Sequence, residues 1–325
     1  MSALRRVAVV ACAVLGASLS ACSKKSEPTP SEEGTPSTSG GEPPAPLAAP
    51  PQVLYLPDGG DLVTNQGQLE PLSPLLPHQP PNVSSGCPPE MVSIRGQFCI
   101  DRFEASLVDT RERALSPYYP PSRDELLHVL SVFRGLRPRR SAPELPLPPE
   151  FSLSEAFEPR ARSVGSSVPS GYMSGLMARA ACGNAGKRLC TAEEWVTACK
   201  GERATKYPYG DRYVAGACNV FREAHPAVLL WGDASRNHLD PRLNLAAGAE
   251  GPLLRKTGES PQCRSQWGPD AVYDMVGNLD EWVDDAGGAF HGGFYSRGTR
   301  DGCDARISSH PPRYFDYSLG VRCCK

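Results

Sequence analysis

The chain has 325 residues, of which 40% are hydrophobic, and a formal net charge of -2 at pH 7. This balance gives no electrostatic case for nucleic acid as a partner, because a nucleic-acid-binding domain carries an excess of Lys and Arg. About 240 residues follow position 85, which is ample length for one large domain with a proper hydrophobic core.

Residues 1–22 have the pattern of an export signal. Arg5 and Arg6 form a basic start, residues 7–19 are an apolar run, and small residues lead to Cys22. The run is too short to be a membrane-spanning helix. The last four residues, LSAC, resemble a bacterial lipobox, in which Cys22 becomes the lipid-bearing first residue of the mature chain. Ordinary cleavage beside an incidental cysteine is the alternative.

The lipid anchor sets the expected location. Ser23, rather than Asp, follows the cysteine, which by resemblance to Gram-negative lipoproteins favours the outer membrane. We therefore expect a cell-envelope protein attached to the membrane through its lipid. Residues 23–85 are rich in Pro, Ser, Gly, Glu and Thr and cannot bury enough apolar surface to offset the entropy of ordering. They should form a disordered or polyproline-like tether.

Cysteine usage agrees with export. Ten cysteines remain besides Cys12 and Cys22, and an even number in an exported chain predicts a disulfide framework. A metal-thiolate cluster is the competing interpretation, but the chain has no pair of CxxC motifs. The ten candidates are Cys87, Cys99, Cys182, Cys190, Cys199, Cys218, Cys263, Cys303, Cys323 and Cys324.

The domain opens with a predicted β-hairpin. Residues 87–94 and 98–101 have strand character, and Gly96 lies where the chain must reverse. Cys87 and Cys99 flank this turn, so a disulfide that closes the hairpin is plausible.

Two stretches are predicted as long insertions. Residues 110–168 are rich in Pro, Arg and Ser, with one helical turn expected at 124–133. Residues 222–265 are loop-rich with few periodic signals. We interpret both as surface segments, and a binding loop is the alternative function for them.

Two helices have clear signals. The first should begin at a Ser170 cap and end at Gly183 or Gly186, with apolar residues at helical spacing. These apolar residues are Met173, Leu176, Met177, Ala180 and Ala181. The second should begin with a capping box formed by Thr191 and Glu194. Trp195, Val196 and Cys199 lie along one side of this helix, which should end near Gly201.

Residues 271–285, AVYDMVGNLDEWVDD, concentrate polar chemistry. A short apolar run leads into Gly277-Asn278, which favours a turn because both residues tolerate positive φ. We expect the turn to bring four carboxylates into one small space around Trp282, namely Asp280, Glu281, Asp284 and Asp285. Such a group requires neutralisation, so Ca²⁺ is a candidate, and a solvated acidic turn is the alternative.

Ordered blocks resemble the formylglycine-generating enzyme, or sulfatase-modifying factor, family. They are GKRLCTAEEW, ACKG, YPYGD, ACN, VYDMVGNLDEWVDD, HGGFYSRG, DARISS and LGVRCC, and the opening MVSIRGQFCIDRFEAS fits the family's start loosely. The resemblance covers nearly all of residues 86–325 apart from the insertions. It implies an irregular, loop-rich α+β fold related to C-type lectins and stabilised here by disulfides.

The resemblance also implies bound calcium. One site carries over onto the Asn219 side chain and the Val220 carbonyl. The other carries over onto Asn278 and the Glu281 carboxylate, whose close spacing on a turn suits the flexible oxygen coordination of Ca²⁺. Asp280 stands where the family often has Trp.

The family's catalytic positions are replaced. Its enzymes oxidise a cysteine of a sulfatase with O₂, using paired cysteines that bind copper(I). Arg297 and Gly302 occupy those positions and cannot bind copper, while Cys303, one residue later, is a weak candidate thiol. His291 and Tyr295 replace the Arg and Trp of the family's RGGSW block, and a catalytic His291 is the less favoured interpretation.

Two functions therefore remain open. The first is a catalytically degenerate, Ca²⁺-stabilised binding module whose partner is a protein, peptide or glycan of the envelope. The second is an oxidase or related enzyme that acts on exported proteins, and only this enzyme would need copper. The resemblance also implies that Cys199 pairs with Cys323 or Cys324.

Overall fold

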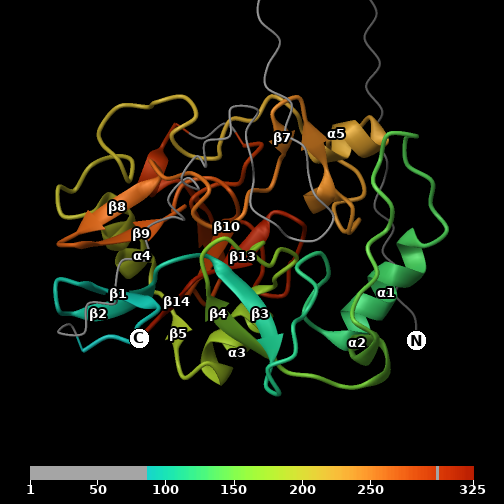
Figure 1. Cartoon of the computed structure of the whole chain (residues 1–325), viewed down its shortest axis with the longest axis horizontal. Helices are drawn as coiled ribbons and strands as arrows, with labels where there is room; N and C mark the ends of the chain where they lie inside the picture. Colours follow the sequence, from blue (N-terminus) through green and yellow to red (C-terminus); the bar gives the residue numbers. More distant parts are fainter. Residues whose placement is uncertain (1–85, 298–299) are drawn as a thin grey trace, which may run out of the picture. The chain divides into compact units, whose positions relative to one another are not determined.

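The computed structural model describes residues 86–297 and 300–325. The predicted export signal, lipidation site and tether all lie outside these residues. Within them, short strands and helices alternate with long loops (Figure 1). The helices are α1 (Arg123–Phe133), α2 (Glu150–Ser154), α3 (Gly175–Asn184), α4 (Ala192–Lys200) and α5 (Pro226–Trp231). Two 3₁₀ turns lie at Leu243–Leu245 and Gly302–Asp304.

Two four-stranded sheets form the centre of the described domain. The first has the order β1-β2-β14-β5 and the second has the order β12-β11-β10-β13, in which β10 and β13 are parallel. Their strands are β1 (Met91–Ile94), β2 (Phe98–Asp101), β5 (Arg188–Leu189), β10 (Asp280–Val283), β11 (Ala289–His291), β12 (Arg306–Ile307), β13 (Leu319–Val321) and β14 (Cys323–Cys324). Antiparallel ribbons pair β3 (Ala105–Asp109) with β4 (Pro159–Ser163), β6 (Ala247–Gly248) with β7 (Gly251–Pro252), and β8 (Arg264–Trp267) with β9 (Asp270–Tyr273).

The sheets bury two neighbouring tryptophans. Trp195 of α4 packs with Val92, Ile100 and Met275, and Trp282 of β10 packs with Phe290 and other apolar residues of α3 and β13. Both indoles are fully buried and both N–H groups donate hydrogen bonds, to Glu281 and to the Met173 carbonyl respectively. The irregular, loop-rich α+β fold predicted from the sequence is confirmed. In the described residues, no helix is long and apolar enough to cross a membrane.

The capping signals were correct for α4 and wrong for α3. Thr191 and Glu194 form the predicted capping box, and α4 ends at Lys200 with Gly201 as its C-cap, as predicted. The N-cap of α3 is Ser174 instead of Ser170. Tyr172 has a φ of 58°, a left-handed conformation that no α-helix accommodates, so the helix begins only after it. Leu176, expected in the core, is 53% exposed.

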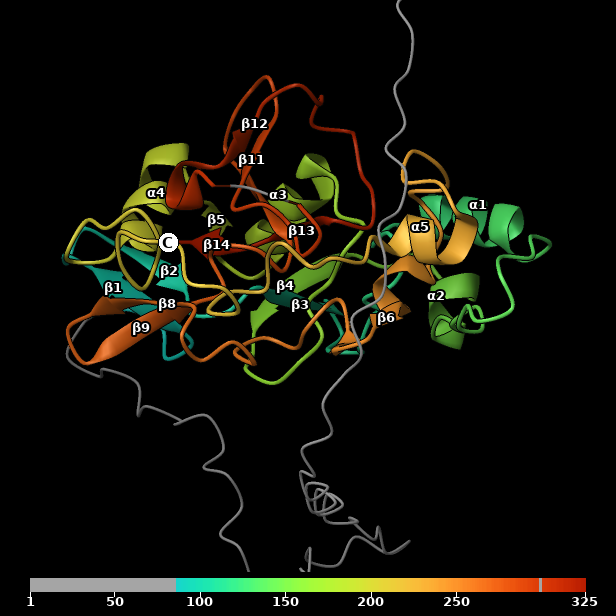
Figure 2. The same ribbon diagram turned by 90° about the horizontal axis from the view of Figure 1, so that it is seen from above.

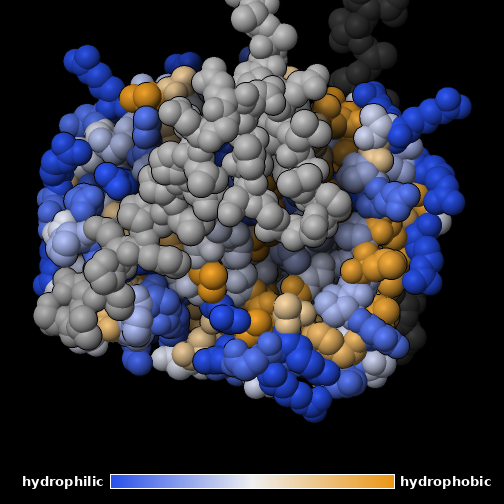
Figure 3. Space-filling view, viewed as in Figure 1, coloured by the Kyte–Doolittle hydropathy of each residue, from blue (hydrophilic) through white to orange (hydrophobic). Residues whose placement is uncertain are grey.

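The two stretches predicted as insertions contribute helices that pack together. Residues of α1, including Val129 and Phe133, share a hydrophobic cluster with Trp231 at the end of α5. The Arg139 backbone N–H donates to the Leu230 carbonyl, which ties the loop after α1 to α5. Figure 2 shows α1, α2 and α5 gathered at one end, and we call these three helices and the loop 134–149 the helical lobe. Along the edge of the face in Figure 3 where this lobe lies, hydrophobic and hydrophilic residues alternate.

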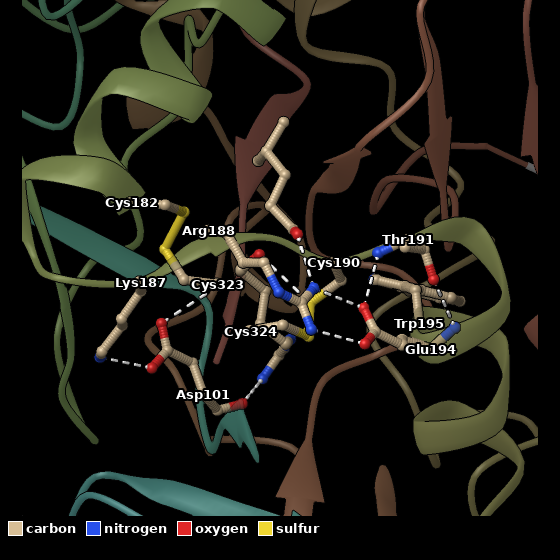
Figure 4. The surroundings of a disulfide bond; sticks show 12 residues. Asp101, Cys182, Lys187, Arg188, Cys190, Thr191, Glu194, Trp195, Cys323 and Cys324 are labelled. Carbon is tan, nitrogen blue, oxygen red and sulfur yellow. Dashed lines mark hydrogen bonds and ion pairs between the residues drawn. A yellow bond between two sulfur atoms is a disulfide. The ribbon is translucent and has the colours of Figure 1, made fainter. Parts of the chain in front are cut away.

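All ten candidate cysteines are paired in disulfides. The predicted hairpin bridge between Cys87 and Cys99 is confirmed. The pairing predicted for Cys199 is wrong, because Cys199 bonds to Cys303. Successive residues of a strand point to opposite faces, so Cys323 reaches Cys182 of α3 while Cys324 reaches Cys190 beyond β5 (Figure 4). The fifth bridge joins Cys218 to Cys263.

Candidate functional site

The four carboxylates after the Gly277-Asn278 turn do not meet in one space, contrary to the prediction. Both turn residues have the expected positive φ, 83° and 61°. The chain then extends as β10, so Asp280 and Glu281 point to opposite faces of the sheet, and Asp284 and Asp285 lie beyond the strand.

Each of these carboxylates has its own arginine. The ion pairs are Asp280–Arg297 at 2.9 Å, Glu281–Arg322 at 2.9 Å, Asp284–Arg179 at 2.6 Å and Asp285–Arg306 at 3.0 Å. The need for neutralisation was therefore correctly predicted, but guanidinium groups from four separate segments meet it. The carboxylates of two pairs, Asp280 and Glu281, are in the interior, and these two pairs define the site.

Glu281 is the counterion of a fully buried arginine. Arg322 Nε and Nη2 donate to both Glu281 oxygens at 2.9–3.2 Å, and Trp195 Nε1 donates to Oε2 at 2.6 Å. The remaining donors of Arg322 bind the carbonyls of Asp101 at 2.9 Å and Tyr273 at 2.7 Å. The guanidinium thus connects β2, β9, β10 and the junction of β13 with β14. Glu281 has no oxygen left without a donor.

Two further buried acids lie around this pair. Glu104 accepts from Asn278 Nδ2 at 2.5 Å and from the Leu279 N–H at 3.0 Å. Asp274 accepts from the Gly258 N–H. Burial, and then repulsion from Asp274 and Glu281, raise the pKa of Glu104 well above its ordinary value. Burial raises the pKa of Asp274 to about 7.

The residues that were predicted to bind calcium differ in whether their side-chain oxygens already accept hydrogen bonds. Asn278 Oδ1 accepts from Asn219 Nδ2 and the Arg255 N–H, and its amide nitrogen donates to Glu104, so this side chain is saturated. Glu281 is saturated as well. The donors around Asn278 and Glu281 therefore do not fit a calcium ligand set. Asn219 Oδ1 is buried without a hydrogen-bond partner in the described part of the chain, so it retains a free acceptor beside Val220.

Asp280 and Arg297 occupy positions where the resemblance places a tryptophan and a copper-binding cysteine. Arg297 Nη1 donates to Asp280 Oδ1 at 3.0 Å, and the Gly293 N–H donates to the same oxygen at 2.9 Å. Burial raises the pKa of Asp280 to about 7 against the opposing effect of Arg297. Asp280 is 1% exposed, so the Arg297 side chain is fixed by a buried partner.

The second position of the cysteine pair has no room for any side chain. Gly302 has a φ of 61°, and a Cβ there would collide with the backbone carbonyl of Lys206. Cys303, the weak candidate thiol, is fully buried and bonded to Cys199.

His291 is buried on β11, and its ring lies 5.2 Å from that of Trp195 at an interplanar angle of 32°. Neither ring nitrogen has a hydrogen-bond partner in the described residues. Burial, and secondarily Arg306, lower the pKa of His291 to about 4, so the ring is neutral at pH 7. We assign it no chemistry.

A groove of about 460 Å³ is lined by residues of 213–224 and 248–255, and two of its residues bond to the backbone of Tyr295 and Arg297. The Phe221 N–H donates to the Arg297 carbonyl, and the Arg222 N–H donates to that of Tyr295. Tyr213, 43% exposed, packs edge-on against Phe221 at 5.0 Å, while Arg222 forms an ion pair with Glu250 at 2.9 Å. We call this feature the Tyr213 groove. It presents an aromatic face and a charged rim, the kind of lining that binding sites use.

Residues 169–325 match the family described as the sulfatase-modifying factor enzyme 1-like domain. This region is a domain of that family, as the ordered blocks predicted. No curated protein sequence matches the chain.

Solved structures similar to the chain include PvdO from Pseudomonas aeruginosa, CarF, and the U1 variant of Major Tropism Determinant. PvdO and CarF are each 14% identical over 70% of this chain, covering 79% and 86% of their own lengths, both with a TM-score of 0.34. The third is 13% identical over 74% of this chain and 53% of its own, with a TM-score of 0.33.

Sequence reasoning missed Glu104, Asp274 and Arg322. No such signal exists for these three residues, but one existed for the Asp280–Arg297 pair. By the resemblance, Asp280 stands in place of a Trp and Arg297 in place of a Cys. Two such replacements of opposite charge suggest contact between the positions.

Proposed function

We propose that the chain is an exported, lipid-anchored binding module of the sulfatase-modifying factor family that has lost the family's oxidase chemistry. The observation that carries this proposal is the ion pair between Arg297 and the buried Asp280 carboxylate. A guanidinium is a permanent cation, so it repels copper(I) and cannot replace a thiolate ligand. The same residue also holds Asp280, which makes it part of the fold.

Two neighbouring features support the loss of catalysis. Gly302 excludes a side chain at the second cysteine position. Cys303 is committed to the bridge that holds α4 to the 3₁₀ turn at Gly302–Asp304. A one-residue shift of the pair onto Cys303 would therefore break this bridge before any copper could bind.

The Tyr213 groove is the proposed binding surface for a protein, peptide or glycan of the cell envelope. It lies against the backbone of Tyr295 and Arg297, next to the positions where the family carries its chemistry. Tyr213 is the exposed aromatic group of the groove, and aromatic side chains are enriched where proteins bind partners. Substrate recognition retained without catalysis would produce such a module.

Calcium remains in the proposal only at Asn219 and Val220. The free Asn219 Oδ1 is a hard oxygen donor, which is the type that Ca²⁺ prefers. Bound there, the ion would fix the contact between the loop at Asn219 and the Gly277-Asn278 turn, in which the Asn278 N–H donates to the Asn219 carbonyl at 2.8 Å. The ion would thus act on stability and not on a reaction.

The decisive experiment measures thiols and copper on the purified, oxidised chain. We expect no thiol from the ten domain cysteines to react with a labelling reagent after denaturation without reductant, and no stoichiometric copper(I) uptake. Cys87→Ser, which frees the Cys99 thiol, is the control that must label once. Stoichiometric copper uptake together with oxidation of a CxPxR peptide would overturn the binding module in favour of the oxidase.

The anchor is tested separately. Acylated wild-type protein should sediment with membranes and carry lipid mass, whereas Cys22→Ala should carry none. An unmodified Cys22 residue or a mature chain that begins elsewhere would refute the lipoprotein part of the proposal without touching the binding part.

A further inference from the structure

The loop that follows α1 is strongly basic. Between Leu126 and Pro143 the chain contains no Asp or Glu, and Arg134, Arg137, Arg139 and Arg140 fall within seven positions. All four arginines are exposed. Other arginines of the domain, such as Arg179 and Arg306, form ion pairs, but no ion pair of these four occurs among the described residues. Their charge therefore faces solvent uncompensated.

The loop is held in place despite its exposure. Arg134 N–H donates to the Leu130 carbonyl, and Arg139 N–H donates to the Leu230 carbonyl of α5 at 2.9 Å. Arg242 Nη1 donates to the Leu136 carbonyl, and Arg242 is itself fixed by Asp240. Backbone contacts to two different helices thus fix the positions from which the arginine side chains extend.

Apolar side chains are exposed within the same segment. Val132 is 43% exposed and Leu136 is 37% exposed, and they alternate along the chain with the arginines. Leu147, further along the lobe, is 86% exposed. A soluble polyanion would gain from the arginines but would leave these apolar groups in water. A lipid surface satisfies both, because guanidinium groups bind phosphate and apolar side chains enter the headgroup boundary.

We propose that residues Val132–Arg140 of the helical lobe are a contact surface for the phosphate headgroups of an anionic membrane. The surface is separate from the Tyr213 groove, and it does not depend on the proposed loss of catalysis. Where an acyl anchor is present, a cationic patch reinforces it, because each contact raises the local concentration for the other. The domain would then lie with its helical lobe against the membrane.

The test uses the unacylated chain from Ser23 to Lys325, which keeps every residue that the structure describes. Binding is measured by co-sedimentation with vesicles of phosphatidylcholine alone or with about one third phosphatidylglycerol. We expect binding only to the anionic vesicles, weakened by salt. Each arginine near an anionic surface contributes about fivefold to binding, so Arg134→Gln/Arg137→Gln/Arg140→Gln should bind about a hundredfold less.

Two control variants are needed. The first distinguishes the position of the arginines from the net charge, and the second distinguishes binding to a lipid surface from binding to soluble phosphate. Arg162→Gln/Arg212→Gln/Arg313→Gln removes the same charge from exposed arginines elsewhere and should keep most of the binding. Val132→Ser/Leu136→Ser should weaken vesicle binding several-fold while leaving any binding of soluble polyphosphate unchanged. Melting temperatures of all variants should stay near wild type.

Three results would overturn the proposal. Equal binding of both vesicle types excludes headgroup recognition. Equal losses in the two arginine triple variants mean that net charge alone acts. Binding of polyphosphate together with vesicle binding that is insensitive to Val132→Ser/Leu136→Ser identifies a soluble polyanion as the ligand.

Discussion

Replacing Arg322 with Met removes the guanidinium at the centre of the domain. Arg322 is fully buried, and the change leaves the Glu281 carboxylate without its counterion and two carbonyls, of Asp101 and Tyr273, without donors. Breaking a buried ion pair from one side costs about 3–5 kcal/mol, because an uncompensated charge stays in the interior. For a domain of this size we expect a Tm lower by roughly 6–20 °C.

The cost should depend on pH. Burial raises the pKa of Asp274 from 3.8 to about 7, and that of Glu104 also lies well above its ordinary value. A carboxyl with a raised pKa in the folded state stabilises the fold at pH values below its unfolded pKa, and this contribution is lost as the pH rises through the folded pKa. Without the positive charge of Arg322, Asp274 and Glu104 should take up protons more readily. Arg322→Met should therefore be less destabilising at pH 5.5 than at pH 7.5.

Thermal melting followed by tryptophan fluorescence at both pH values measures this effect, since Trp195 and Trp282 are buried. Arg179→Met is the matched control, because its pair with Asp284 is about half exposed and should contribute less than about 1 kcal/mol. Glu281→Gln/Arg322→Met should recover part of the loss, since it removes both charges and keeps an acceptor for Trp195. Similar melting of Arg322→Met and Arg179→Met at both pH values would refute the reasoning.

Three more changes test other parts of the structure. Gly302→Ala should lower the Tm by several degrees, because φ is positive and the added Cβ meets the Lys206 carbonyl. The control is Gly183→Ala inside α3, which should be neutral or stabilising because nothing lies near the added Cβ. Equal Tm values for the two variants would show that position 302 tolerates a side chain. Cys199→Ser/Cys303→Ser should lower the free energy of unfolding by about 2–5 kcal/mol. Cys87→Ser/Cys99→Ser should lower it by about 2 kcal/mol less, because this bridge closes 12 residues instead of 104. A larger loss for the hairpin variant in denaturant unfolding would contradict the loop-entropy argument. Chelation should lower the Tm of wild type but not further that of Asn219→Ala, and an unchanged wild-type melting curve under chelator would remove calcium from the proposal.

Local features were predictable because neighbouring residues carry them. The capping box of Thr191 and Glu194 depends on residues three positions apart. The hairpin and its disulfide depend on a short turn between Cys87 and Cys99. The positive φ values of Gly277 and Asn278 follow from residue type. The local pattern was misleading at Ser170, where contacts from far along the chain prevailed. A Cβ on Gly171 would collide with Asn244 and with the Tyr317 carbonyl, so this segment packs closely against residues distant in sequence.

Distant partners account for what the sequence could not reveal. Four acids within six residues appeared to require one common cation, yet their arginines come from positions 179, 297, 306 and 322. The pairing of β10 with β13 brings Arg322 beneath Glu281, and the pairing of β14 with β5 takes Cys323 and Cys324 away from Cys199.

The amino-acid order thus determined the family, the helical and turn signals and the presence of an even set of cysteines, all of which depend on residue type and short spacing. The tertiary structure decided the partners of the ion pairs and of the disulfides. These side chains become neighbours only when the sheets assemble, so their interaction energies depend on the whole fold. Asp280 and Arg297 illustrate both levels: residue type alone shows two opposite charges 17 positions apart, and only the folded chain shows that Arg297 is the partner of the buried Asp280 carboxylate.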